Sequence, residues 1–172
     1  MNFETVKKDD EDLMMHTYGR FPVCITGGNG SVATDINGKT YIDFGSGIGV
    51  NSLGYCEDGY VNAVTEQLRR LQHCSNLYYS EPQLKVAEKL IEKSGMKRVL
   101  FCNSGAEANE CSIKIARKYS FDKYGQNRNK IVTLQNSFHG RTITTLSATG
   151  QEAFHDFFFP FTDGFCFANA ND

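Results

Sequence analysis

Apolar and polar positions first show a strand-like pattern near the start of the chain. Two runs rich in strand-forming residues, 31–36 and 39–44, flank the pair Asn37-Gly38. Asn-Gly is the strongest two-residue signal for a hairpin turn, because both positions accept the positive φ that such a turn requires. The pattern predicts a β-hairpin over residues 31–44.

Apolar residues then recur at helical spacing in two segments. In residues 58–72 they are Val61, Val64, Leu68 and Leu71. In the segment from Ser80 to Gly95 they are Leu84, Ala87, Leu90 and Ile91. The spacing predicts two amphipathic helices, the second one capped by Ser80 with Pro82 in its first turn. We expect the apolar stripe of the second helix to be buried.

The segment from Arg98 to Lys118 is the centre of the pattern. An apolar run, 99–102, predicts a strand that breaks at Asn103-Ser104-Gly105 and continues as a helix to about residue 124. Residues 130–134 predict a further buried strand. Strand, helix and strand in this order predict an α/β fold with a right-handed crossover between parallel strands.

The turn at Gly105 can be interpreted in two ways. A strand, a glycine turn and a helix start in succession present unpaired N–H groups and a positive dipole end, which suit a phosphate. Ser104 followed by Glu107 is also a capping box, which any helix can carry without a ligand. The turn lacks the Gly-Lys-Ser or Gly-Lys-Thr ending of a nucleotide-binding P-loop, and the glycines at 45–49 lack dinucleotide-binding spacing.

Composition narrows the class of protein. The 172 residues contain 18 Lys and Arg against 20 Asp and Glu, so no basic surface for nucleic acid or an anionic membrane is expected. Six cysteines without a Cys-x-x-Cys pair suggest neither a zinc site nor a disulfide framework. Without an apolar leader or a membrane-length apolar stretch, we expect a cytoplasmic protein.

Two motifs together resemble one family. Residues 103–110 read NSGAEANE and residues 136–141 read NSFHGR. Both resemble the class III pyridoxal-phosphate-dependent aminotransferases, most closely the acetylornithine aminotransferases. Similar segments occur in family order from residues 18–23 through 75–79 to 147–152. One departure is residues 54–58, Gly-Tyr-Cys-Glu-Asp, where the family usually has Gly-His-x-His-Pro.

The resemblance implies the front part of a fold-type I transferase. Residues 1–57 would form an N-terminal segment with the hairpin, and 58–172 the first, incomplete part of the large domain that binds pyridoxal 5'-phosphate. Ser104, Gly105 and Ala106 would bind the cofactor's phosphate. Phe138 would stack on its ring, although a phenylalanine after a strand can simply be core. Arg141 would pair with the substrate α-carboxylate, or be a surface arginine.

The implied reaction is reversible amino-group transfer from an acylated ornithine to 2-oxoglutarate. The family's Schiff-base lysine and its pyridine-pairing Asp lie further along the fold, and no lysine in residues 1–172 resembles that motif. We therefore expect no catalytic residue in this chain and no activity from the chain alone. The complete protein would be a homodimer, and its amino donor stays open.

The chain's end gives a further expectation. Seven phenylalanines crowd residues 154–167, and Asn171-Asp172 stand where a helix cap would begin. This suggests the front portion of a longer aminotransferase. The alternative is a non-catalytic remnant or interaction module that binds pyridoxal phosphate or an anion weakly.

Overall fold

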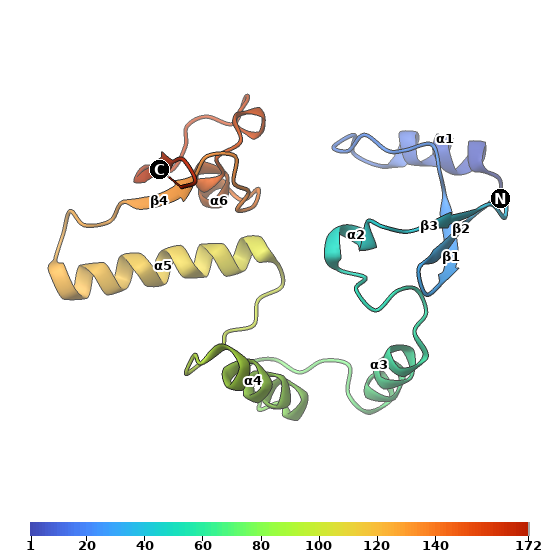
Figure 1. Ribbon diagram of the computed structural model, residues 1–172, viewed down its shortest axis with the longest axis horizontal. Helices are drawn as coiled ribbons and strands as arrows, with labels where there is room; N and C mark the ends of the chain where they lie inside the picture. The colour runs from blue at the N-terminus through green and yellow to red at the C-terminus, as the bar shows by residue number, and fades with distance from the viewer. Residues whose placement is uncertain (172) are drawn as a thin grey trace. The chain divides into compact units, whose positions relative to one another are not determined.

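The computed structural model describes residues 1–171 (Figure 1). They form two compact units, the first from Met1 to Ser80 and the second from Glu81 onward. The domain boundary between residues 57 and 58 concerns the complete fold and stays a prediction.

A three-stranded antiparallel sheet lies at the centre of the first unit. Helix α1 (Phe3–Leu13) precedes β1 (Ile25–Asn29), β2 (Val32–Asp35) and β3 (Thr40–Ile42), which pair in that order. The β2–β3 pair confirms the predicted hairpin. Strand β1 was not predicted, because its two glycines are poor strand formers. Gly28 is needed there, since a Cβ atom would lie 2.7 Å from the Tyr55 ring.

Asp35 organises the hairpin turn. Its Oδ1 accepts the N–H groups of Asn37 and Lys39, each at 2.9 Å, and its Oδ2 accepts the Tyr41 hydroxyl at 2.8 Å. Burial opposes ionisation of this carboxyl, but these hydrogen bonds and the charge of Lys39 outweigh burial and lower its pKa. The hydrogen bond between the Tyr41 hydroxyl and Asp35 raises the pKa of Tyr41.

Three helices follow the sheet along the chain, two in the first unit and one at the start of the second. The short α2 (Ser46–Gly49) has left-handed backbone at Gly47 and Ile48. Helices α3 (Asp58–Arg70) and α4 (Glu81–Ser94) confirm the two predicted helices. The predicted burial of the α4 stripe is wrong: Leu84 is 63% exposed, and no residue of α4 is buried. Helical spacing predicts which residues share a face of a helix, but it does not show what covers that face. No element within residues 1–171 covers the apolar face of α4.

The second unit joins helices to a two-stranded parallel sheet. It contains α5 (Gly105–Tyr124), β4 (Ile131–Leu134), α6 (Ile143–Ala148), the short 3-10 helix η1 (Glu152–Phe154) and β5 (Phe165–Ala168). Strands β4 and β5 pair in parallel from Ile131 opposite Phe165 to Leu134 opposite Ala168. Helix α6 begins two residues after Arg141.

The predicted strand at residues 99–102 is wrong. These residues carry no strand assignment, because a strand requires a ladder of hydrogen bonds and nothing within residues 1–171 pairs with them. The crossover between parallel strands therefore runs from β4 through α6 to β5, and does not enclose α5.

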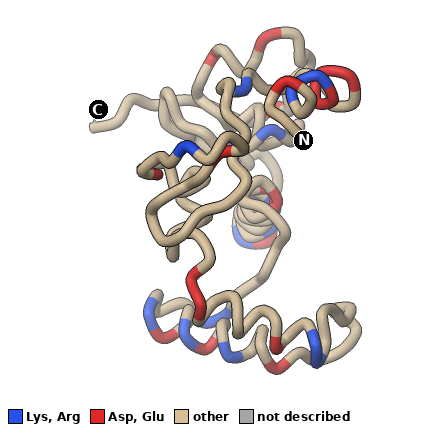
Figure 2. The backbone as a smooth tube through the Cα atoms, turned by 90° about the vertical axis from the view of Figure 1, so that its right-hand side faces the viewer, with Lys and Arg blue, Asp and Glu red and all other residues tan. Residues whose placement is uncertain are grey.

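Few side chains of the described residues are buried. The apolar ones are Ala33, Ile113, Leu146 and Ala148. Several phenylalanines of the C-terminal segment stay exposed, and Phe157 is 94% accessible. Figure 2 shows acidic and basic residues interspersed along the helices. No helix among residues 1–171 has the length and apolar character that crossing a membrane requires.

Asp35 gives a prediction about pH. The ionised carboxylate stabilises the hairpin above the pKa that it has in the unfolded chain, and this stabilisation is lost as the pH falls through the lowered folded pKa. In an NMR titration of the chain, the amide shifts of Asn37 and Lys39 should move together, with a midpoint below the ordinary Asp value. The shared titration should vanish in Asp35→Asn and persist in the control Asp43→Asn. A midpoint at or above the ordinary value would contradict this assignment.

Candidate active site

The N-terminus of α5 is the first part of the site. Ser104 is its N-cap residue, with extended backbone, and its Oγ accepts the N–H of Glu107 at 3.2 Å. This confirms the predicted cap. Gly105 and Ala106 are the first two helical residues, whose N–H groups have no acceptor within an α-helix. We call the Ser104 hydroxyl and the Gly105 and Ala106 N–H groups the α5 cradle.

The α5 cradle has room for an anion. A Cβ atom added at Gly105 would meet nothing within 4 Å. The Ser104 hydroxyl lies 3.3 Å from the Glu107 carboxylate, a long separation for two oxygens, so its hydrogen can turn to a better acceptor. Together with the positive end of the helix dipole, these donors fit a phosphate.

A glycine brings the second predicted motif against this helix end. Gly140 is buried and has φ of +129°, a backbone region that favours glycine. A Cβ atom there would lie 2.8 Å from the Ala106 Cβ and 2.6 Å from Thr145 Oγ1. Residues 138–141 can therefore approach α5 this closely only with glycine at position 140.

Phe138 and Arg141 flank Gly140 in the sequence, and their side chains lie near each other. The Phe138 ring is 5.5 Å from the Phe154 ring between centroids, and Phe138 is 50% exposed. The guanidinium carbon of Arg141 lies 5.7 Å from the centroids of both rings. Within residues 1–171, Phe138 is thus not part of a buried core. Half of its surface is accessible to a ligand.

Hydrogen bonds also join α5 to the second motif. Asn109 Nδ2 donates to the His139 carbonyl oxygen at 2.7 Å, and the Thr142 hydroxyl donates to the Glu110 carboxylate. The His139 N–H donates to Thr149 Oγ1 at 3.0 Å. Neither Asn109 nor Glu110 was predicted from the sequence as a site residue. Their place inside the NSGAEANE motif was the available signal, but the spacing does not say what they contact.

A small cavity lies beneath α5, beside β4. Its volume is about 280 Å³, and Asn109, Ser112, Thr133 and His139 contribute polar groups to its lining. Two buried atoms in this wall, His139 Nε2 and Thr133 Oγ1, have no hydrogen-bond partner among the described residues. Ordered water is the usual partner of such atoms.

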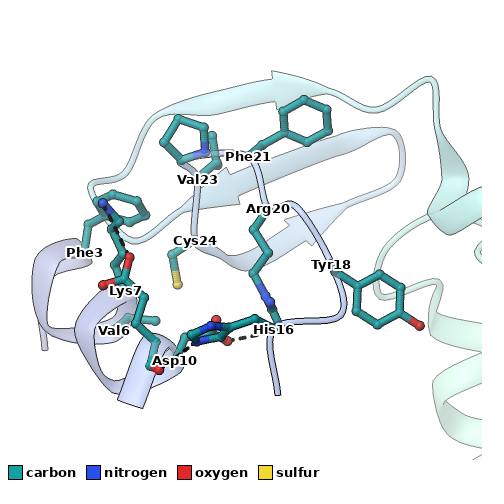
Figure 3. A pocket seen from close by; sticks show the side chains of 12 residues that line it. Phe3, Val6, Lys7, Asp10, His16, Tyr18, Arg20, Phe21, Val23 and Cys24 are labelled. Atoms are coloured by element: carbon teal, nitrogen blue, oxygen red, sulfur yellow. Dashed lines mark hydrogen bonds and ion pairs between the residues drawn. The ribbon is translucent and has the colours of Figure 1, made fainter. Parts of the chain in front are cut away.

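The first unit contains a separate hollow that the sequence analysis did not identify. It lies between α1 and residues 16–24 and has a volume of about 730 Å³ (Figure 3). The charges at its wall are paired: Arg20 with Asp10 at 3.2 Å, and Lys7 with Glu11 at 3.8 Å. Three aromatic side chains, Phe3, Tyr18 and Phe21, supply much of the remaining lining.

No group of three or more metal-ligating side chains occurs within residues 1–171. The groups that the site presents among these residues are hydrogen-bond donors, an aromatic ring and a guanidinium group.

Comparison with known proteins covers the whole chain. The family model Aminotransferase class-III matches residues 13–172. The acetylornithine aminotransferase of Haemophilus ducreyi is 52% identical over 172 residues, which are 100% of this chain and 44% of that protein. The acetylornithine aminotransferase of Methanocaldococcus jannaschii is 48% identical over 158 residues, 92% of this chain and 40% of that protein.

Solved structures agree with the fold. The ornithine aminotransferase of Toxoplasma gondii superposes with a TM-score of 0.93 at 31% identity, over 100% of this chain and 41% of that one. An aminotransferase of Bacillus anthracis gives a TM-score of 0.88 at 34% identity, over 100% of this chain and 40% of that one.

The chain thus spans about two fifths of the length of the relatives that it matches. The α/β architecture corresponds to the N-terminal part of a fold-type I transferase. Class III aminotransferases are pyridoxal-phosphate enzymes, and the geometry of these donors suits that cofactor. This chain belongs to the class III aminotransferase family.

Proposed function

We propose that the complete protein is an aminotransferase that moves the terminal amino group of an acylated ornithine reversibly to 2-oxoglutarate. One observation carries the proposal: Gly140 packs on Ala106, which joins a helix end suited to phosphate with an accessible aromatic ring and a guanidinium group. A phosphorylated planar cofactor and a carboxylate substrate need these groups together.

The α5 cradle would hold the phosphate of pyridoxal 5'-phosphate. The Gly105 and Ala106 N–H groups would each donate one hydrogen bond, and the Ser104 hydroxyl a third. The Ser104 Oγ can still accept the Glu107 N–H, because a hydroxyl has one hydrogen and two lone pairs. The helix cap and the phosphate site therefore do not compete for the same atoms.

Phe138 would lie against the flat face of the cofactor ring, and Arg141 would orient the substrate carboxylate. A guanidinium group forms two parallel hydrogen bonds with a carboxylate, which fixes direction as well as distance. When bound, the cofactor supplies the electron sink for amino-group transfer. The residues of this chain then contribute binding and orientation.

The names of the relatives support an ornithine-type amino donor. The curated relatives reported above are acetylornithine aminotransferases, and the Toxoplasma gondii structure is an ornithine aminotransferase. We infer a role in arginine biosynthesis, in the cytoplasm and as a homodimer. The division into an N-terminal segment, 1–57, and the first part of a large domain, 58–172, belongs to the same proposal.

Cofactor binding gives the first test. Pyridoxamine 5'-phosphate is the probe of choice, because it has no aldehyde that could react with surface lysines. Ser104→Asp should keep the cap, since Asp caps helices as well as Ser does, yet it should weaken binding about tenfold or more by repelling the phosphate. Ser104→Ala should lower the free energy of unfolding by about 1 kcal/mol through loss of the cap.

Fluorescence titration would measure the binding, and urea denaturation followed by circular dichroism the unfolding. Asn2→Asp is the matched control: it adds the same charge at the N-cap of α1, and should leave binding unchanged. Equal affinity in Ser104→Asp and the parent chain would contradict the assignment of the phosphate to α5. Absence of saturable binding by the folded parent chain would favour a non-catalytic remnant.

Turnover gives a second test. The 172-residue chain should form no glutamate from acetylornithine and 2-oxoglutarate with added cofactor, because none of its lysines occupies a segment like the family's catalytic lysine motif. Glutamate formation can be followed by chromatography, with a heat-treated sample as control. Turnover by a preparation free of other aminotransferases would show that a lysine of this chain serves the reaction.

A further inference from the structure

The second turn of α5 holds the chain on both sides of Arg141. Asn109 Nδ2 donates to the carbonyl oxygen of His139, two residues before Arg141, at 2.7 Å. The hydroxyl of Thr142, the next residue after Arg141, donates to the Glu110 carboxylate. Two consecutive residues of one helix thus bind the chain at His139, before the arginine, and at Thr142, after it.

The chain before Arg141 needs such attachment. Gly140 must be glycine because it packs on Ala106, and glycine leaves the backbone more conformational freedom than any other residue. The close contact with α5 therefore requires a residue that makes the backbone of the 138–141 segment more flexible. The hydrogen bonds from Asn109 and to Glu110 restrict the backbone on both sides of this glycine.

Glu110 also sets the direction of a chain of hydrogen bonds. An ionised carboxylate only accepts, so the single hydroxyl hydrogen of Thr142 points to Glu110. Thr145 Oγ1 then donates its own hydrogen to the Thr142 hydroxyl oxygen, 2.7 Å away, which is closer than its other acceptor, the Thr142 carbonyl oxygen at 3.4 Å. Thr145 Oγ1 in turn accepts the Thr142 N–H at 3.1 Å. The start of α6 is therefore linked through Thr142 to α5.

We propose that Asn109 and Glu110 are positioning residues that fix the distance between the α5 cradle and Arg141. This inference rests on the proposed function of Arg141 as the carboxylate-binding residue. Both residues are half-buried, and both lie on the helix whose first turn forms the cradle. A displacement of about 1 Å between two binding groups can reduce a rate about 100-fold, so one rigid helix serving both groups has a clear advantage.

The test uses the 172-residue chain with two probes. Pyridoxamine 5'-phosphate reports on the α5 cradle, and glutarate, a dicarboxylate without a reactive keto group, reports on Arg141. Asn109→Ala and Glu110→Ala should change the affinity for pyridoxamine 5'-phosphate less than about twofold. They should weaken the binding of glutarate to the chain that already holds pyridoxamine 5'-phosphate about tenfold. Glu110→Gln keeps an acceptor for Thr142 and should stay within about threefold of the parent chain.

Hydrogen exchange supplies a readout without any ligand. The His139 and Thr142 amides, which donate to Thr149 and Thr145, should exchange about tenfold faster in the two Ala variants. The Ile113 amide in the middle of α5 should not change, which separates local release from general unfolding. Asp122→Ala, which removes a carboxylate from the same helix, is the matched control and should behave as the parent chain.

The outcomes separate this inference from the proposed function. Unchanged exchange at His139 and Thr142, or unchanged glutarate affinity in both Ala variants, would overturn the positioning role. If the parent chain binds neither probe, the proposed function of these residues in this chain fails. Exchange then decides alone: faster exchange supports attachment of the Arg141 segment by Asn109 and Glu110, and unchanged exchange refutes it.

Discussion

The contact between Gly140 and Ala106 is the constraint on which the site depends. A Cβ atom at position 140 would lie 2.8 Å from the Ala106 Cβ, so any other residue would push the 138–141 segment away from α5. Without this contact, the capped helix end and the Phe138–Arg141 pair would be two unrelated surface features. With it, the segment that carries an aromatic ring and a guanidinium group lies against the first turn of the helix that carries the hydrogen-bond donors.

The sequence predicted local structure well, because local structure depends on local chemistry. The Asn37-Gly38 turn, the Ser104 cap and the helices at 58–70, 81–94 and 105–124 all follow from turn residues, capping residues and apolar spacing. The strand predicted at 99–102 failed because a strand is completed by partners elsewhere in the chain. For the same reason, apolar spacing alone could not show what covers the stripe of α4.

The site was predictable only in part. The motifs pointed to Ser104, Gly105, Ala106, Phe138 and Arg141 through resemblance, and the structure brings their two segments together. The connections between those segments could not be derived, because Asn109 and His139 are thirty residues apart and nothing in their spacing specifies a hydrogen bond. Such long-range polar contacts are set by the tertiary fold, and a single sequence carries little direct information about them.

The most direct test of the account is an NMR measurement of contacts between bound pyridoxamine 5'-phosphate and the chain. If the two segments form one site, nuclear Overhauser effects from the same bound molecule should reach both Ala106 in α5 and the ring of Phe138. Both sets of contacts should weaken together in Gly140→Ala, which separates the segments. Contacts to Ala106 without any to Phe138, or contacts unaffected by Gly140→Ala, would contradict a single composite site.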